Sequence, residues 1–148
     1  MSNLPLCVDA NLVIRLVGDP QDEVVQQLWE QWDAEHRQIA APTLLYYEVS
    51  NALYRYQHAE MMSASAVRLA LKAALALPIF LYGDDDQHHS GELYQRALAL
   101  AERFSLPAAY DAHYLALADW LGGEFWTADR KLAHVVQGDL SWVHVVKS

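Results

Sequence analysis

Short apolar runs alternate along the chain with longer segments of helical periodicity. The apolar runs, which are typical of buried strands, are residues 4–8, 39–41, 79–82, 124–127 and 142–146. The segments with helical spacing are residues 11–17, 22–35, 43–58, 63–77, 90–104, 110–121 and a short stretch after Asp129. Because strands and helices alternate, the pattern predicts an α/β fold with a parallel sheet covered by helices on both faces.

The length of the chain indicates one domain over residues 1–148. A chain of 148 residues can bury a core without a metal or a disulfide, and no repeat or interdomain linker interrupts it. The single cysteine, Cys7, lies in an apolar run, which suggests a buried thiol in a reducing compartment. Neither a membrane span nor a secretory signal is visible, so we expect a cytoplasmic protein.

The charge of the chain bears on its partners. Ten Lys and Arg residues face 19 Asp and Glu residues, which gives a formal net charge of −9. No global positive field would therefore attract a nucleic acid, which counts against a nuclease. The objection weakens if several acids hold divalent cations where a phosphate must sit, because the cations cancel part of the charge there.

Four acidic residues fall at the boundaries of the predicted elements. Asp9 and Asp129 follow strands, whereas Glu48 and Asp111 lie early in helices. Each has a purely structural alternative: Asp9 and Asp129 could cap the next helix, Asp111 could interact with the helix dipole, and Glu48 could face solvent. Taken singly, none of the four establishes a site.

Their collective placement is more informative. In a parallel sheet with antiparallel helices, all four positions face the edge formed by the carboxyl ends of the strands, where ligands bind in such folds. Carboxylates gathered there repel one another unless cations lie between them. Magnesium prefers oxygen ligands, and the chain has no zinc motif. The sequence therefore predicts a magnesium site at this edge.

The motifs around these acids resemble those of the PIN domain, and more narrowly those of the VapC-type toxins of bacterial toxin–antitoxin pairs. The order and spacing agree over essentially the whole chain. The matching segments are Val8-Asp9-Ala10-Asn11, Glu48-Val49-Ser50-Asn51-Ala52-Leu53, Asp111-Ala112-His113-Tyr114-Leu115-Ala116-Leu117-Ala118 and Thr127-Ala128-Asp129-Arg130-Lys131-Leu132.

The resemblance implies a fold, an activity and an acidic site. The fold is a three-layer α/β/α sandwich with a roughly five-stranded parallel sheet. The activity is endonucleolytic cleavage of RNA that depends on Mg²⁺, for which Mn²⁺ can substitute. Asp9 and Asp111 would ligate the metal directly, while Glu48 and Asp129 would contact the metal or its water. Residues implied to orient the acids are Asn11, Asn51 and Thr127.

Partners are implied by the same resemblance. Antitoxin-regulated members of the family form homodimers through early apolar helices and bind the cognate antitoxin in a nearby groove. Trp29 and Trp32, one helical turn apart, would then belong to the core or to a partner surface rather than to a platform for stacking bases.

Basic and histidine residues offer weaker indications. Arg15, Arg130 and Lys131 are the best local candidates for contacts to substrate phosphate, although each could equally be a solvated surface residue. His88 and His89 follow a run of aspartates, but adjacent histidines in a loop lack a fixed ligand geometry. We expect a polar surface loop there.

Two other classes of protein remain as alternatives. A phosphotransfer domain on a similar sheet fits poorly: a haloacid dehalogenase-like phosphatase needs an aspartate where the chain has Asn11. A response-regulator receiver needs a pair of acids before its phospho-accepting aspartate, whereas Asp9 stands alone. A PIN-like binding module without turnover would be expected to have lost some of the four acids, and all four are present.

Overall fold

A single parallel sheet organises the chain. The computed structural model describes residues 3–83 and 90–147. The sheet has five strands in the order β3-β2-β1-β4-β5, and every neighbouring pair is parallel. The strands are β1 (Leu6–Val8), β2 (Ile39–Pro42), β3 (Ile79–Tyr82), β4 (Glu124–Thr127) and β5 (Val143–Val145). The predicted polar loop at His88 and His89 lies outside the described residues.

The helices fall close to the segments predicted from periodicity. They are α1 (Ala10–Gly18), α2 (Glu23–Ala34), α3 (Leu44–His58), α4 (Ala64–Leu75), α5 (Ser90–Arg103), α6 (Tyr110–Leu121) and α7 (Arg130–Val136). Polar caps define several starts: Asp22 accepts a hydrogen bond from the backbone N–H of Val25, and Ser63 accepts one from that of Ala66. Gly122 ends α6 in the left-handed conformation with φ 65°, which glycine adopts without steric cost.

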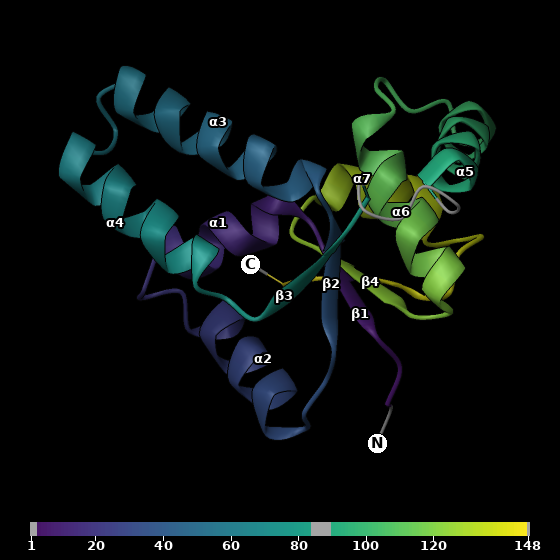
Figure 1. The fold of residues 1–148 in the computed structure, drawn as a ribbon, viewed down its shortest axis with the longest axis horizontal. Helices are drawn as coiled ribbons and strands as arrows, with labels where there is room; N and C mark the ends of the chain where they lie inside the picture. Colours follow the sequence, from purple (N-terminus) through teal and green to yellow (C-terminus); the bar gives the residue numbers. More distant parts are fainter. Residues whose placement is uncertain (1–2, 84–89, 148) are drawn as a thin grey trace.

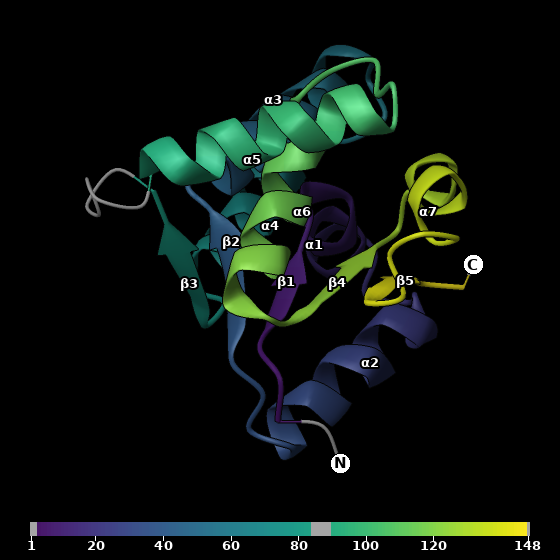
Figure 2. The same ribbon diagram turned by 90° about the vertical axis from the view of Figure 1, so that its right-hand side faces the viewer.

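Helices cover both faces of the sheet, as Figures 1 and 2 show. Helix α1 packs against α2, α3 and α4 on one side, while α6 crosses β1, β2 and β4 on the other and carries α5 on its outer surface. The predicted three-layer α/β/α sandwich is thus confirmed. No helix in the described part of the chain combines the length and hydrophobicity needed to cross a membrane.

The central and edge strands differ in burial. All three residues of β1 are fully buried. One of them is Cys7, and burial raises the pKa of its thiol to about 12. Strand β3 was predicted as a buried strand like the others, and this is wrong: Phe80 is 61% exposed and Leu81 43%. The reason is its place at the end of the strand order, where one side of the strand has no partner strand among the described residues.

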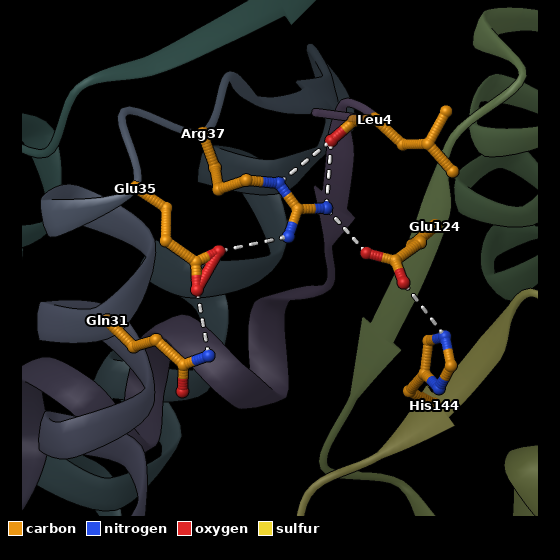
Figure 3. A network of polar contacts seen from close by, with 6 residues as sticks. All are labelled: Leu4, Gln31, Glu35, Arg37, Glu124 and His144. Carbon is orange, nitrogen blue, oxygen red and sulfur yellow. Dashed lines mark hydrogen bonds and ion pairs between the residues drawn. The ribbon is translucent and has the colours of Figure 1, made fainter. Parts of the chain in front are cut away.

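A network of polar contacts ties the amino-terminal edge of the sheet together (Figure 3). The guanidinium of Arg37, just before β2, donates to the backbone carbonyl of Leu4 and to the Glu124 carboxylate at 2.5 Å. Arg37 also lies 3.6 Å from Glu35, and Glu124 lies 3.2 Å from His144. One largely buried cation therefore joins the segments before β1 and β2 to the first residue of β4.

Candidate active site

Asp9 is the most buried of the four predicted acids. It follows β1 directly, where the hydrophobic strand fixes its backbone, and its side chain is only 4% exposed. Oδ1 accepts a hydrogen bond from the N–H of Leu12 at 3.0 Å and so caps α1. Oδ2 accepts a hydrogen bond from the Thr127 hydroxyl. The capping alternative is therefore fulfilled, and it fixes the carboxylate at the edge of the sheet.

Thr127 links two of the acids. It ends β4 and is fully buried. The Thr127 hydroxyl donates a hydrogen bond to Asp9, and its oxygen accepts one from the backbone N–H of Asp129 at 2.9 Å. Asp129 in turn caps α7, accepting from the N–H groups of Lys131 and Leu132 through Oδ1. Strand β1 and strand β4 are neighbours in the sheet, which is why residues distant in sequence meet here.

Glu48 reaches the same region from α3. It is half-buried, and its Oε1 accepts a hydrogen bond from the Tyr114 hydroxyl of α6 at 2.5 Å. Tyr114 is almost fully buried against the core, so the position of its hydroxyl is fixed by packing. The Glu48 side chain is therefore held beside α6 and does not extend freely into solvent.

Asp111 completes the group. It lies in the first turn of α6, one helical turn before Tyr114, and is half-buried. Asp9, Glu48 and Asp111 line one pocket of about 180 Å³, and Asn11, Asn51 and Arg55 are among its other lining residues. Asp129 stands beside this pocket rather than in its lining. We call this cavity the acid pocket.

The acids perturb one another electrically. The pKa of Asp9 is raised to about 7, chiefly by burial and also by the charges of Asp111 and Asp129, against the opposing hydrogen bonds from Thr127 and Leu12. Burial, Asp129 and Glu48 raise the pKa of Asp111. Burial and the Glu48 hydrogen bond likewise raise the pKa of the Tyr114 hydroxyl, so it stays a proton donor. No salt bridge joins any of the four acids to a basic side chain in the described part of the chain.

Other residues implicated by the sequence are placed differently. Asn11 and Asn51 line the acid pocket, but within residues 3–83 and 90–147 neither amide hydrogen-bonds to an acid. Arg15 points its guanidinium to Asp22 at 2.6 Å and lies outside the pocket lining. Arg130 and Lys131 are exposed at the start of α7.

Two residues of the site escaped the sequence interpretation. Arg55 lies seven residues after Glu48 and therefore on the same face of α3, and Tyr114 lies three residues after Asp111 on α6. Helical spacing from an established acid is the signal that could have found both. Arg55 is the basic side chain in the lining of the acid pocket.

The donor set suits a hard divalent cation. Carboxylate oxygens are the ligands that Mg²⁺ prefers, and mutual repulsion among unpaired carboxylates is relieved when a cation binds between them. Asp9, Glu48 and Asp111 supply these oxygens from three different elements, with Asp129 close enough to raise two of their pKa values. Among the described residues, no three Asp, Glu, His or Cys side chains are already positioned close enough together to hold a metal ion.

Known proteins share this fold. The chain is similar to the protein PAE2754 of Pyrobaculum aerophilum, with 23% identity and a TM-score of 0.66 over 92% of this chain and 82% of that one. It is also similar to VapBC2 from Rickettsia felis, solved bound to a DNA fragment from its promoter, with 12% identity and a TM-score of 0.69 over 97% of this chain and 100% of that one. No match was found among curated proteins. A family model described as PIN domain matches residues 6–137. Because that match covers most of the chain and includes all four acids, the chain belongs to the PIN domain family.

Proposed function

We propose that the protein is an endoribonuclease that uses Mg²⁺, or Mn²⁺ in its place, to hydrolyse phosphodiester bonds of RNA. The observation that carries the proposal is the meeting of Asp9, Glu48 and Asp111 in one pocket at the carboxyl edge of the sheet, beside Asp129. Among the described residues no salt bridge joins these acids to a basic side chain. An anionic phosphate cannot approach such a pocket unless a cation occupies it.

The roles of the residues follow from their contacts. Asp9, Glu48 and Asp111 would hold the metal, with Asp129 contacting it or its water. A bound Mg²⁺ supplies a nucleophilic water near neutral pH and offsets charge on the phosphate. Thr127 and Tyr114 orient Asp9 and Glu48 by donating hydrogen bonds to them. One of the carboxylates would accept a proton from the attacking water, and Arg55, in the lining of the acid pocket, would bind a phosphate oxygen of the substrate.

We further propose that the protein is the toxin of a toxin–antitoxin pair, forms a homodimer and acts in the cytoplasm. The fold that it shares with VapBC2 supports an antitoxin partner, and the buried thiol of Cys7 suits a reducing compartment. Induced expression should then arrest growth, and expression of Asp9→Asn should not. Growth arrest by the inactive variant would contradict the proposal.

The decisive test is cleavage of labelled single-stranded and structured RNAs by the purified protein with Mg²⁺, Mn²⁺ or a chelator. Asp9→Asn and Asp111→Asn should each lower the cleavage rate by more than roughly 100-fold, the upper end of the loss caused by removing a residue that hydrogen-bonds to a metal ligand. Asp119→Asn is the matched control, because Asp119 is on the same helix as Asp111 but is exposed and paired with Arg96. Cleavage that persists in chelator or in both variants would refute the proposal, and a folded wild-type protein that cuts no RNA would favour a binding module.

A further inference from the structure

A second cavity lies at the same edge of the sheet as the acid pocket. It has a volume of about 280 Å³ and is built around the ends of β2 and β3 and the helices α3, α5 and α6. We call it the tyrosine pocket, because four tyrosines and a histidine contribute to its lining: Tyr47, Tyr82, Tyr94, Tyr110 and His113. Three of these tyrosines are well exposed, Tyr47 by 73%, Tyr94 by 53% and Tyr110 by 60%.

The tyrosine pocket and the acid pocket share two helices. On α3, Tyr47 lines the tyrosine pocket and the next residue, Glu48, lines the acid pocket. On α6, Tyr110 and His113 line the tyrosine pocket, while Asp111 and Tyr114 line the acid pocket. Adjacent residues on a helix point about 100° apart, so the amino-terminal turns of the two helices present one cavity on each side. A group bound in one cavity is therefore a direct neighbour of a group bound in the other.

The lining that the structure describes is aromatic and apolar. Of residues 3–83 and 90–147, those that line the tyrosine pocket include no Asp, Glu, Lys or Arg. Exposed tyrosine rings offer flat faces for stacking, and the hydroxyls and the imidazole of His113 offer hydrogen bonds at the rim. Single-stranded RNA is recognised in this way, through bases stacked on aromatic side chains and hydrogen-bonded at their edges.

The charge of the chain adds a second argument. Proteins usually gain most of their affinity for nucleic acids from contacts between basic residues and phosphates. Here the net charge is −9, and Arg55 is the basic residue lining the acid pocket. Beyond what a bound cation and Arg55 contribute, contacts that do not depend on phosphates add affinity for RNA, and stacking on neutral aromatic rings is a contact of this kind.

We propose that the tyrosine pocket binds a nucleobase of the RNA substrate next to the phosphate that is cleaved. The proposal rests on the ribonuclease activity proposed above and names the part of the protein that selects single-stranded RNA. Tyr47 and Tyr110 provide the stacking faces. An unpaired base enters the pocket while its backbone runs over the first turns of α3 and α6 to the acid pocket, and a duplex cannot offer its bases in this way.

The test separates binding from cleavage. Binding of a fluorescently labelled single-stranded RNA oligonucleotide to Asp9→Asn protein is measured by anisotropy in Mg²⁺. Tyr47→Ala and Tyr110→Ala, each introduced into that background, should weaken binding by about 5-fold to 100-fold, the cost of losing one stacked base. Tyr47→Phe keeps the ring and should retain binding. Tyr54→Ala is the matched control, because Tyr54 is a 59% exposed tyrosine on α3 outside both pockets.

Other outcomes would overturn the inference. If Tyr47→Ala and Tyr110→Ala bind the RNA as tightly as Tyr54→Ala does, the pocket holds no base. If Tyr47→Ala dissociates a dimer in sedimentation experiments while leaving RNA affinity unchanged, the tyrosine pocket is an interface between two copies of the chain. Cleavage of the same RNA by the wild-type protein is scored separately, so absence of cleavage refutes the proposed activity without deciding whether a base binds.

Discussion

The two edges of the sheet both hold carboxylates away from solvent, but they neutralise them differently. At the amino-terminal edge, Glu124 is paired with Arg37 and His144 (Figure 3). At the carboxyl-terminal edge, Asp9 accepts hydrogen bonds from Leu12 and Thr127, and the other acids of the site repel Asp9 and Asp111. Among the described residues no salt bridge joins either acid to a basic side chain. At the amino-terminal edge the carboxylates thus have a cation of the chain beside them, and we call it the balanced edge.

The other edge is left with a deficit of positive charge. Unpaired buried charges are costly, and a protein retains them where a ligand or a metal supplies the missing partner. A buried acid is therefore best recognised as part of a functional site by the cation that it lacks, because burial alone does not distinguish Asp9 from a structural carboxylate such as Glu124.

The largest effect should follow from loosening the functional edge without removing an acid. Thr127→Val keeps the shape of the buried side chain but deletes the hydroxyl that joins Asp9 to the backbone of Asp129. Partners that orient metal ligands are worth about 10- to 100-fold in activity or metal affinity. We expect a loss of that size in the cleavage rate and a higher Mg²⁺ requirement. Thr127→Ser restores the hydroxyl and should recover most of the activity, and equal losses in both variants would contradict the role of the hydrogen bond.

The pH dependence of stability should distinguish the two edges next. Folding raises the pKa of Asp9 from the ordinary 3.8 to about 7, so the protonated carboxyl is favoured in the folded protein. The contribution of Asp9 to the free energy of unfolding is therefore complete below about pH 4 and is lost as the pH rises through about 7. We expect metal-free protein to lose on the order of 2 kcal/mol between pH 5 and pH 8 from this group.

Urea unfolding at the two pH values measures this loss. Mg²⁺ should stabilise the protein more at pH 8 than at pH 5, because the ionised carboxylates are its proposed ligands. Asp9→Asn should flatten the pH dependence of the metal-free protein. An unchanged slope in that variant would mean that another group is responsible.

The smallest effect on activity should come from the balanced edge. Arg37→Met leaves Glu124 half-buried with only His144 as a partner and should lower the free energy of unfolding by about 2 kcal/mol, less than a fully buried pair because both carboxylates are partly exposed. The cleavage rate of the folded protein should not change. Arg96→Met is the matched control, since Arg96 also bridges two acids but is 39% exposed, and it should cost about 0.5 kcal/mol or less. A large loss of activity in Arg37→Met would end the distinction between the edges.

Much of the fold could be predicted because its signals are local. Each apolar run that predicts a strand, and each polar residue that caps a helix, is recognised from residues close together in sequence. The twelve elements of the described residues lie close to their predicted bounds. The error at β3 has a physical reason: the apolar run 79–82 has the composition of a central strand, but composition does not contain the strand order that leaves Phe80 exposed at the edge. The arrangement of the acids at the carboxyl edge followed from the same local boundaries, together with the geometry of parallel sheets.

The sequence by itself determined where each strand ends and which acid follows it, since Asp9 after β1 and Asp129 after β4 are fixed by neighbouring residues. Only the tertiary structure decided which side chains meet: Tyr114 with Glu48, Thr127 with Asp9, and Arg37 with Glu124 across a separation of 87 residues. It also placed Arg55 in the acid pocket, engaged Arg15 with Asp22, and gathered tyrosines from α3, β3, α5 and α6 around one cavity. Contacts of this kind depend on packing between distant segments, and hydrophobic periodicity records only that a residue faces the core, not which residue it meets there.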